Sequence, residues 1–377
     1  MNTLTTPVFA LRVLVVMLGV ISLSCASRDC TDRGGSTAGV KSSQISESSD
    51  KQDIVTTAGG QLMLNGQRYR FVGVNVYGLA GFPANSDGYN CGKGYTDEQV
   101  IQILSEVAAM GANVVRVQAY QSFTQGGADF SRTDLIVDAA RERGIKIIFT
   151  LENQWDDCTE GGYKYASWYK TRFRHPYGSY PSSFKDYART FAKHYRDEPA
   201  VLMYQLMNES ESVSSNDFPD PEAILAFARE MAATVKKADP THLLSFGTSG
   251  ILKPGTGGPF FALLHLVEGI DIVEAHDYRS ERQGMPDVIR LALMTARQIS
   301  KPFFIGETGI GSPPFSKTDR AYFLKRKLEA AWEEGVDGVL VWSYRSNDGS
   351  NKDFGPKDPF VFQLRRINKV NKITPQP

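Results

Sequence analysis

Eight short apolar runs, separated by longer amphipathic stretches, restrict the folds open to this chain. Runs that are apolar on both faces are typical of strands covered on both sides, as in parallel sheets. Eight strand–helix alternations in roughly 320 residues predict a (β/α)8 TIM barrel. A doubly wound sheet would often carry a Gly-rich phosphate-binding turn, and the sequence has none. The runs are residues 71–77, 113–120, 145–151, 201–207, 243–249, 270–276, 302–308 and 338–344.

Helix and turn signals lie before and between these runs. A capping box from Thr96 to Gln99 predicts a helix that continues to about Met110. Asn65-Gly66 joins two short strand-like runs, which predicts an N-terminal β-hairpin that caps one end of the domain. Further helices are expected over residues 131–144, about 183–196 and 221–238, the last of them ending before Pro240.

The N-terminal stretch has the pattern of a signal peptide. Arg12 precedes the apolar residues 13–23, which are too few for the roughly 20 residues of a membrane-spanning helix. In "ISLSC", Cys25 follows small residues, as in a bacterial lipoprotein cleavage box, although Ser22 stands where such boxes usually have Leu. Lipidation of Cys25 and ordinary cleavage near Ala26 both remain open.

The next segment is rich in Ser, Gly, Lys and Asp and cannot bury a core. We therefore divide the chain into a signal peptide (1–24), a flexible Ser-rich tether (25–56) and a folded domain (57–377). This organisation predicts a protein outside the cytoplasm, either secreted or anchored by lipid to the cell envelope.

The four cysteines agree with export. Cys25 lies at the junction of the leader and the tether and Cys30 in the tether, which leaves Cys91 and Cys158 in the folded domain. In an oxidising compartment these two are expected to form a disulfide, and two unrelated reduced thiols are the alternative. No C-x-x-C spacing occurs in the sequence, so we predict no zinc site.

The charge balance excludes some classes of partner. With 42 basic and 42 acidic side chains, the chain has no net field to attract nucleic acid or an anionic membrane surface. Aromatic residues make up 11% and suit either a large core or stacking on uncharged rings. H-E-x-x-H and G-x-S-x-G motifs are absent from the sequence. We expect a monomer without metal or cofactor that acts on a neutral ligand.

Polar and aromatic residues gather where the predicted strands end. In a (β/α)8 barrel the catalytic side chains lie at the carboxyl ends of the strands. The candidates are Asn75, Tyr77, Arg116, Glu152, Asn153, Trp155, Asn208, Glu209, His276, Tyr278, Glu307 and Trp342.

Two of these carboxyl groups suit the cleavage of a glycosidic bond. That reaction needs one protonated carboxyl group and one ionised carboxylate, about 5 to 5.5 Å apart in retaining enzymes. We expect Arg116 and Tyr278 to keep Glu307 charged. Glu209, beside Asn208 and with fewer positive neighbours, is the expected proton donor.

Each candidate also has a purely structural interpretation. Glu209 could be a solvated loop acid, and Arg116 could belong to a structural ion pair. His276 could be an ordinary core histidine, and Trp342 could fill the barrel. The long loop after the third run carries Trp155, Tyr163, Tyr165 and Trp168, which could stack on sugars or pack on one another.

The ordered set of motifs resembles glycoside hydrolase family 5. The matching pieces are the Arg in "VVRVQ", the Asn-Glu pair in "YQLMNES", "EAHDY", the Glu in "FIGETG" and the Trp in "LVWSY", which together span residues 60–345. The resemblance implies that Glu209 is the acid/base and Glu307 the nucleophile of a retaining enzyme. It also implies that Asn208 contacts the sugar 2-hydroxyl, that Arg116, His276 and Tyr278 support the nucleophile, and that Trp342 forms the floor under the cleaved sugar.

Within that family, "TLENQWDDCTEGGYKYASW" and "NVYGL" look like endo-β-1,4-mannanases. We therefore add Asn153, Trp155, Asn75 and Tyr77 to the expected substrate-binding residues. Glu152 and the insertion with Cys158 are not the usual mannanase pattern, so an endo-β-1,4-glucanase or another β-glycosidase remains an alternative. A carbohydrate-binding protein built on an inactive barrel is the alternative from a different class.

Overall fold

The computed structural model describes residues 53–83, 94–214, 216–278, 284–345 and 350–373. All of them belong to one compact unit, residues 47–377. The predicted signal peptide, most of the tether, Cys25, Cys30 and Cys91 lie outside the described residues. The Cys91–Cys158 disulfide therefore stays a prediction. Among the helices in the described part of the chain, none combines the length and the apolar character needed to cross a bilayer.

Eight parallel strands form a barrel, as the apolar runs predict. They are β4 (Phe71–Asn75), β5 (Val114–Gln118), β6 (Lys146–Thr150), β7 (Val201–Gln205), β8 (Leu243–Ser245), β9 (Val273–Asp277), β10 (Phe303–Thr308) and β11 (Gly338–Val341). Their order is β8-β7-β6-β5-β4-β11-β10-β9. A parallel bridge between Ser245 and Ile272 nearly closes the sheet on itself. The strands are shorter than the predicted runs, most of them because the last residues of the run leave the sheet at the barrel mouth; β9 and β10 instead begin later than their runs.

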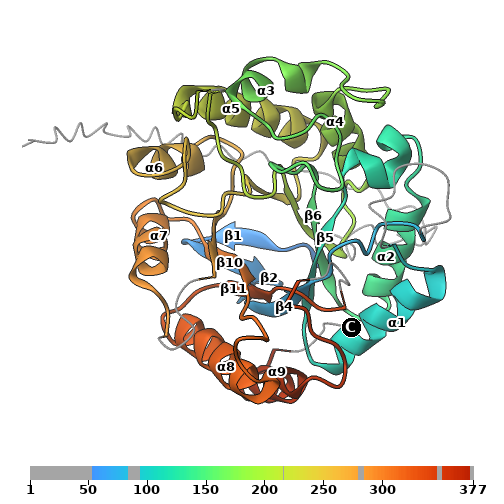
Figure 1. Cartoon of the computed structure of the whole chain (residues 1–377), viewed down its shortest axis with the longest axis vertical. Coiled ribbons are helices and arrows are strands. Elements are labelled where there is room, and N and C mark those ends of the chain that lie inside the picture. Colours follow the sequence, from blue (N-terminus) through green and yellow to red (C-terminus); the bar gives the residue numbers. More distant parts are fainter. Residues whose placement is uncertain (1–52, 84–93, 215, 279–283, 346–349, 374–377) are drawn as a thin grey trace, which may run out of the picture. The chain divides into compact units, whose positions relative to one another are not determined.

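Helices surround the strands, as Figure 1 shows. They are α1 (Asp97–Ala109), α2 (Ser131–Arg141), α3 (Ala166–Lys170), α4 (Phe184–His194), α5 (Pro221–Ala238), α6 (Pro259–His265), α7 (Asp287–Gln298), α8 (Lys317–Glu333) and α9 (Pro359–Val370). The capping box is confirmed, since the Thr96 hydroxyl accepts from the Gln99 backbone and the Gln99 side chain accepts from the Thr96 backbone. Helix α5 has the predicted bounds, whereas α2 ends three residues before the predicted Gly144.

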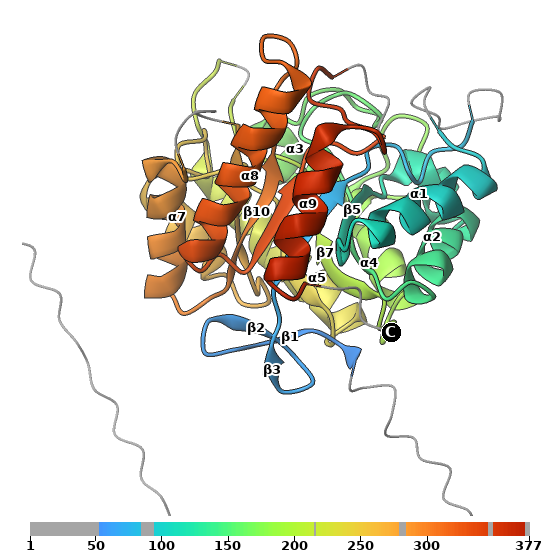
Figure 2. The same cartoon turned by 90° about the horizontal axis from the view of Figure 1, so that it is seen from below.

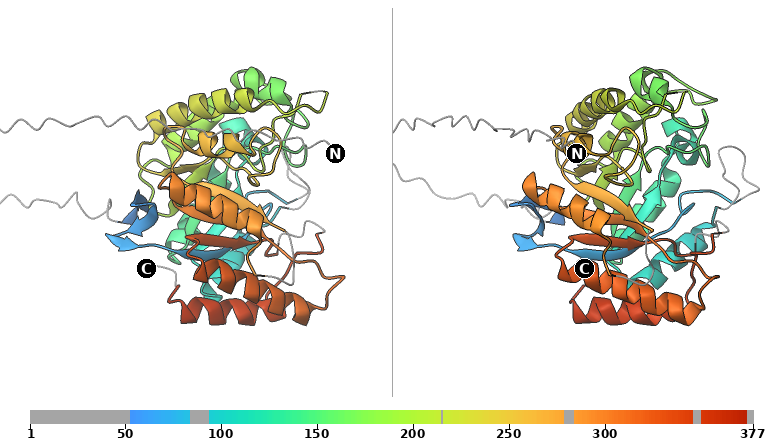
Figure 3. Two further views of the ribbon diagram at one scale, coloured as in Figure 1. Left: turned by 90° about the vertical axis from the view of Figure 1, so that its left-hand side faces the viewer. Right: turned by 60° about the vertical axis from the view of Figure 1, so that its left-hand side comes forward.

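A small antiparallel sheet covers the end of the barrel where the strands begin (Figures 2 and 3). Its strands are β1 (Thr56–Ala58), β2 (Gln61–Leu64) and β3 (Gln67–Arg68). The hairpin of β2 and β3 is confirmed, with Asn65 and Gly66 at φ values of 53° and 74° in its turn. The sequence did not reveal β1, which consists of three exposed residues.

Apolar packing joins this small sheet to the barrel. Val55 and Leu62 are fully buried in one cluster with side chains from the starts of the barrel strands, such as Val114 and Leu243. The predicted boundary between tether and domain, at residues 56 and 57, falls inside this packed segment because Ile54 and Val55 are already buried. The sheet thus closes one end of the barrel and leaves the other end for a site.

Candidate active site

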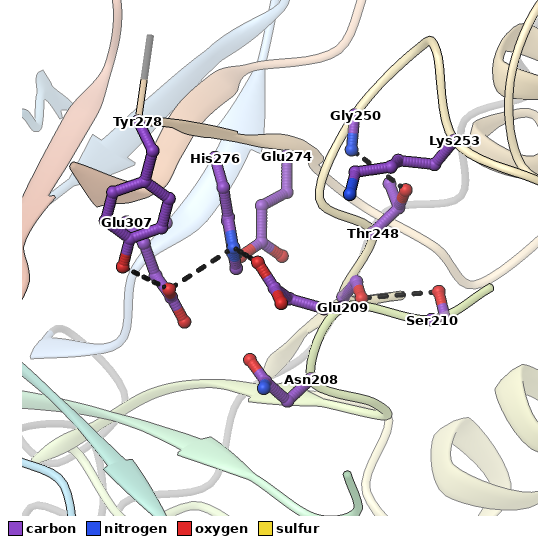
Figure 4. A network of polar contacts seen from close by, with 12 residues as sticks. Asn208, Glu209, Ser210, Thr248, Gly250, Lys253, Glu274, His276, Tyr278 and Glu307 are labelled. Atoms are coloured by element: carbon purple, nitrogen blue, oxygen red, sulfur yellow. Dashed lines mark hydrogen bonds and ion pairs between the residues drawn. The ribbon is translucent and has the colours of Figure 1, made fainter. Parts of the chain in front are cut away.

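The two predicted carboxyl groups meet at the carboxyl ends of the barrel strands. Glu307 is the fifth residue of β10, and it pairs in register with His276 of β9. Glu209 follows β7 by four residues. A chain that leaves parallel strands at one edge brings side chains distant in sequence together, and Figure 4 shows this convergence.

Glu307 is buried and is held by two donors. Arg116 donates from Nη1 to Oε1 at 2.7 Å, and Tyr278 donates its hydroxyl to Oε2 at 2.7 Å. The side chain of Glu307 is only 5% exposed. One donor on each oxygen fixes the plane of the carboxylate, which confirms the predicted contacts of Arg116 and Tyr278 with Glu307.

Arg116 is the hub of the polar network inside the barrel. Its guanidinium is fully buried and donates to four acceptors, which are Glu307, Asn75, Asn208 and Gln205, at 2.7 to 2.9 Å. A buried charge needs a paired counter-ion and satisfied hydrogen bonds, and Arg116 has both. The ion pair is therefore structural and also belongs to the site, so the two interpretations of Arg116 describe one arrangement.

Glu209 is held in a different way. Its Oε1 lies 2.7 Å from His276 Nδ1, and its Oε2 accepts from the indole of Trp155 at 2.9 Å. Its side chain is 20% exposed, so it is more accessible than that of Glu307. The backbone of Glu209 is left-handed, with φ of 52°, a conformation that is uncommon for a residue with a Cβ and that clusters at functional sites.

His276 joins the two carboxylates. The resemblance assigns it to Glu307, but its Nδ1 lies 3.4 Å from Glu307 Oε2 and 2.7 Å from Glu209 Oε1. His276 therefore contacts both acids, and it lies closer to Glu209 than to Glu307. Its Nε2 lies 3.3 Å from Glu274 Oε1, so this imidazole lies among three carboxylates.

His276, Glu209 and Glu307 form a trio of coupled titratable groups, and their pKa values differ from those expected from the sequence. Burial by itself lowers the pKa of His276, but the charge of Glu307 and the hydrogen bonds with Glu209 and Glu274 raise it to about 10. Burial raises the pKa of Glu209, yet the hydrogen bond and charge of His276 outweigh burial and lower it to about 2. Burial raises the pKa of Glu307, against the charges of His276 and Arg116.

Between His276 and Glu209, these shifts favour the proton on His276. Glu209 was expected to have fewer positive neighbours than Glu307; it lies 2.7 Å from His276, whereas Glu307 contacts Arg116 at 2.7 Å and lies 3.4 Å from His276. Asn208, beside Glu209 in the sequence, accepts from Arg116 and donates to Asn153 at 3.0 Å.

The separation of the two carboxyl groups fits retention. One oxygen of Glu209, one oxygen of Glu307 and a His276 nitrogen all lie within 4.8 Å of one another. Retaining glycosidases have carboxyl groups about 5 to 5.5 Å apart, whereas inverting ones leave about 6.5 to 9.5 Å for a water. The same three groups are close enough to ligate a cation, but each of the four carboxylate oxygens already has a hydrogen-bonding partner.

A cavity of about 490 Å³ lies over the carboxyl pair and is lined by Trp342, Tyr77 and Asn208 as well as by both acids. The rings of Tyr77 and Trp342 are 5.7 Å apart between centroids. This cavity brings together the predicted floor residue and the residues expected to contact a sugar. Asn75 is placed differently: it is fully buried beneath the cavity, where it accepts from Arg116.

The loop after β6 places Trp155 at the site and turns Glu152 away from it. Glu152 is fully buried, accepts hydrogen bonds from Thr159 and Tyr177, and lies 3.6 Å from Lys164 Nζ. These contacts tie the loop to the end of β6. Among the loop aromatics, Trp168 is buried in the core, whereas the ring of Tyr163 contacts both Trp155 and Tyr165.

Sequence reasoning missed two buried polar residues that support the site. Glu274 accepts from Ser245 at 2.8 Å and from Gln205, and Gln205 accepts from Arg116. Strand periodicity could have revealed Glu274, because it stands two residues before His276 and therefore on the same face of β9. Gln205 is the single polar residue of β7, and such a residue in a buried strand needs a partner.

Comparison with known proteins agrees with this geometry. The family model described as "Cellulase (glycosyl hydrolase family 5)" matches residues 77–348. The chain is 26% identical over 366 residues to the protein named mannan endo-1,4-beta-mannosidase 8 from Oryza sativa subsp. japonica, covering 80% of this chain and 94% of that protein. It is 30% identical over 267 residues to mannan endo-1,4-beta-mannosidase 7 from Arabidopsis thaliana, covering 60% and 59% of the two chains.

A solved structure has the same fold. The endo-1,4-beta-mannanase from Rhizomucor miehei superposes with a TM-score of 0.67 at 20% identity, and the match covers 84% of this chain and 99% of that one. Because the family model covers well over half of the sequence, the chain belongs to glycosyl hydrolase family 5 and is a glycoside hydrolase.

Proposed function

We propose that this protein is a retaining endo-β-1,4-glycanase, with mannan as its substrate. The observation that carries the proposal is the carboxyl pair within 4.8 Å, in which Glu307 is buried and fixed by two donors while Glu209 is more accessible. A nucleophile needs a fixed orientation, and an acid/base must reach the departing oxygen and then water.

In the first step, Glu307 attacks the anomeric carbon of the sugar that lies over Trp342. The bond between that carbon and the leaving oxygen breaks, and Glu209 delivers a proton to the oxygen. A covalent glycosyl ester on Glu307 results. Arg116 and Tyr278 hold the attacking carboxylate in place during this step.

His276 supplies the proton that Glu209 needs. Transfer along the 2.7 Å contact between them turns an imidazolium–carboxylate pair into imidazole and carboxylic acid without changing the net charge of the trio. Attack by Glu307 neutralises one of the charges that stabilise the imidazolium. Ester formation therefore favours movement of the proton toward Glu209 and the leaving oxygen.

In the second step, Glu209 takes a proton from water, and the resulting hydroxide attacks the anomeric carbon. The ester bond to Glu307 breaks, and the sugar leaves with its original anomeric configuration. Trp155, which donates to Glu209, keeps the acid/base oriented through both steps.

Two observations support mannan as the substrate. The relatives named above are mannan endo-1,4-beta-mannosidases at 26% and 30% identity. The Asn153–Trp155 segment, whose pattern predicts a mannanase, lies at the site, where Asn153 accepts from Asn208 and Trp155 donates to Glu209. Mannose and glucose differ in the direction of the 2-hydroxyl, so a substrate panel must separate a mannanase from a glucanase.

The test is release of reducing ends from mannan, carboxymethyl cellulose and xyloglucan, followed by NMR of the first product. We expect hydrolysis of mannan above the others and a β-anomer as the first product. Preferred hydrolysis of carboxymethyl cellulose would favour the glucanase alternative, and an α-anomer would reject retention. Binding without hydrolysis, unchanged in Glu307→Ala, would favour a carbohydrate-binding protein.

We also propose that the chain acts outside the cytoplasm. The support is the leader pattern before Cys25 and the small-residue box that ends at this cysteine. Expression in a bacterial host with labelled fatty acid should give a labelled envelope protein if Cys25 is lipidated, and the label should disappear in Cys25→Ala. An unlabelled protein in the medium would indicate ordinary cleavage near Ala26.

A further inference from the structure

Glu274 is a fully buried side chain on β9 that does not line the cavity over the carboxyl pair. Its Oε2 accepts hydrogen bonds from Ser245 at 2.8 Å and from Gln205, and its Oε1 lies 3.3 Å from Nε2 of His276. Figure 4 shows Glu274 beside His276. Gly306 on β10 leaves space for this contact, because a Cβ there would lie 2.0 Å from Oε1 of Glu274 and 3.1 Å from Nε2 of His276.

The partners of Gln205 determine which of its atoms faces Glu274. Nε of Arg116 can only donate, and it lies 2.8 Å from Oε1 of Gln205. This contact turns the amide nitrogen of Gln205, which can also only donate, toward Oε2 of Glu274. The hydroxyl of Ser245 adds a second donor at the same oxygen. Both donors lie at Oε2, which leaves Oε1 of Glu274 to accept from Nε2 of His276.

The other charged and titratable groups around His276 lie at its second nitrogen or bind elsewhere. Glu209 and Glu307 lie 2.7 and 3.4 Å from Nδ1. In the described part of the chain, Glu274 is the one acceptor within hydrogen-bonding distance of Nε2. The groups that bind elsewhere are Arg116 and Tyr278, which contact Glu307, Lys253, which contacts Glu211, and His265 of α6, which contacts the Phe261 carbonyl.

A hydrogen bond at one ring nitrogen of a histidine decides which nitrogen keeps the proton in the neutral imidazole. We infer that Glu274 is a positioning residue that holds a proton on Nε2 of His276, so that the proton exchanged with Glu209 is the one on Nδ1. When the Nδ1–H bond breaks and the proton joins Oε1 of Glu209, the imidazole that remains carries its proton on Nε2. Its free Nδ1 lone pair then faces Glu209 and can take a proton back. The inference rests on the proposed function, in which Glu209 is the acid/base.

Two substitutions of Glu274 distinguish this role from a purely structural one. In Glu274→Gln the side chain keeps its size, and its oxygen can accept the hydrogen bonds from Gln205 and Ser245. The amide nitrogen then points a donor at Nε2 of His276, which favours the opposite tautomer, with the proton on Nδ1. Glu274→Ala removes the acceptor without supplying a donor, so it leaves either tautomer open.

The kinetic test compares a glycan with an aryl glycoside that has a good leaving group. On the glycan, kcat/KM per folded molecule should fall about 10²-fold in Glu274→Gln and about tenfold in Glu274→Ala. On the aryl glycoside, whose leaving oxygen needs no proton, both losses should be much smaller. A structural role would give the opposite order, with the milder loss in Glu274→Gln, and equal losses on the two substrates. That result would overturn the inference.

A pH titration followed by ¹⁵N NMR of labelled histidine reports the tautomer directly. Burial lowers the pKa of His276, but the charge of Glu307 and the hydrogen bonds with Glu209 and Glu274 raise it to about 10. The wild type should therefore lose the Nδ1 proton as the pH rises through that value. Glu274→Gln should lose the Nε2 proton instead, and at lower pH. The chain has five histidines, and the signal of His276 is the one missing in His276→Gln.

The buried pair of His242 and Asp239 gives a matched control away from the site. Nδ1 of His242 lies 2.5 Å from Oδ2 of Asp239, and both side chains are fully buried. Asp239→Asn should change the NMR signals of His242 but keep the wild-type ratio of kcat/KM between glycan and aryl glycoside. A ratio that falls as far as in Glu274→Gln would overturn the inference.

Failure of this inference can be told apart from failure of the proposed function. An active wild type whose neutral His276 carries its proton on Nδ1, or a Glu274→Gln variant that keeps the Nε2 proton, would overturn the inference alone. Absence of reducing ends from every glycan would overturn both.

Discussion

The two ends of the barrel are built from the same strands but are stabilised by different forces. At the end covered by β1 to β3, Val114, Ile272 and Leu62 share one apolar cluster. At the other end, Arg116 and His276 belong to a network of charges and hydrogen bonds.

The change from one environment to the other takes only a few residues. Val114 and Arg116 stand two positions apart on β5, and Ile272, just before β9, is followed at the same spacing by Glu274 and His276 on β9. Residues at this spacing lie on one face of a strand, so both sets point into the barrel. The lesson is that the covered end should determine stability and the open end should determine chemistry.

The largest expected effect is at the open end, on the nucleophile. Glu307→Gln keeps the hydrogen-bonding shape but removes the attacking charge, so kcat should fall on the order of 10⁵-fold. The thermal midpoint should also fall, because the buried Arg116 loses its counter-ion, so kcat is compared per folded molecule. Steady-state kinetics on the best glycan and a melting curve check this, and near-normal activity would remove Glu307 from the mechanism.

The acid/base should show a smaller and conditional effect. Glu209→Ala should lower kcat about 10³-fold on a glycan, whose leaving oxygen needs a proton. The loss should be much smaller on an aryl glycoside with a good leaving group, and added azide should restore turnover by replacing the activated water. Equal losses on both substrates, without rescue, would argue against proton transfer by Glu209.

At the covered end, shortening a buried side chain should reduce the stability of the fold and leave catalysis unchanged. Leu62 is fully buried in the apolar cluster, so Leu62→Ala should lower the free energy of unfolding by about 3 kcal/mol, or roughly 10²-fold in the unfolding constant. Chemical denaturation measures the loss. The pH profile of kcat/KM, expressed per folded molecule, should not move, and a shifted profile would mean that the two ends are coupled.

The smallest effect concerns pH and the proton on His276. The carboxylates raise the pKa of His276 to about 10, so the wild-type trio keeps its proton at lower pH and loses it as the pH rises through that value. In His276→Gln, Glu209 must hold the proton itself, and the alkaline limb of kcat/KM should move to lower pH. At pH 8 the variant should lose about tenfold more activity than at pH 5. An alkaline limb that stays in place would show that His276 does not supply the proton.

Much of the fold follows from local sequence signals. The eight apolar runs, the capping box at Thr96 and the Asn65-Gly66 turn each specify an element with little help from the rest of the chain. The three exposed residues of β1 carry no such signal. Their strand depends on pairing with β2, so only the three-dimensional structure reveals it.

For the candidate site, the sequence predicted which residues stand at strand ends, but it did not predict their contacts and it missed Glu274 and Gln205. Residues at strand ends could be identified, because barrel topology decides which ends meet. The closer contact of His276 with Glu209 than with Glu307, and the turn of Glu152 away from the cavity, depend on side-chain geometry between distant segments. The preference of the proton for His276 also depends on burial and on three neighbouring carboxylates, which no linear motif records.

The central claim is that Glu307 forms the covalent intermediate while Glu209 handles the proton. Incubation with an activated 2-deoxy-2-fluoro glycoside, which slows release of the intermediate, followed by peptide mass spectrometry tests it directly. One fluoroglycosyl group per chain, attached to Glu307 and absent in Glu307→Gln, is the predicted result. A label on Glu209, or an active enzyme that acquires no label, would contradict it.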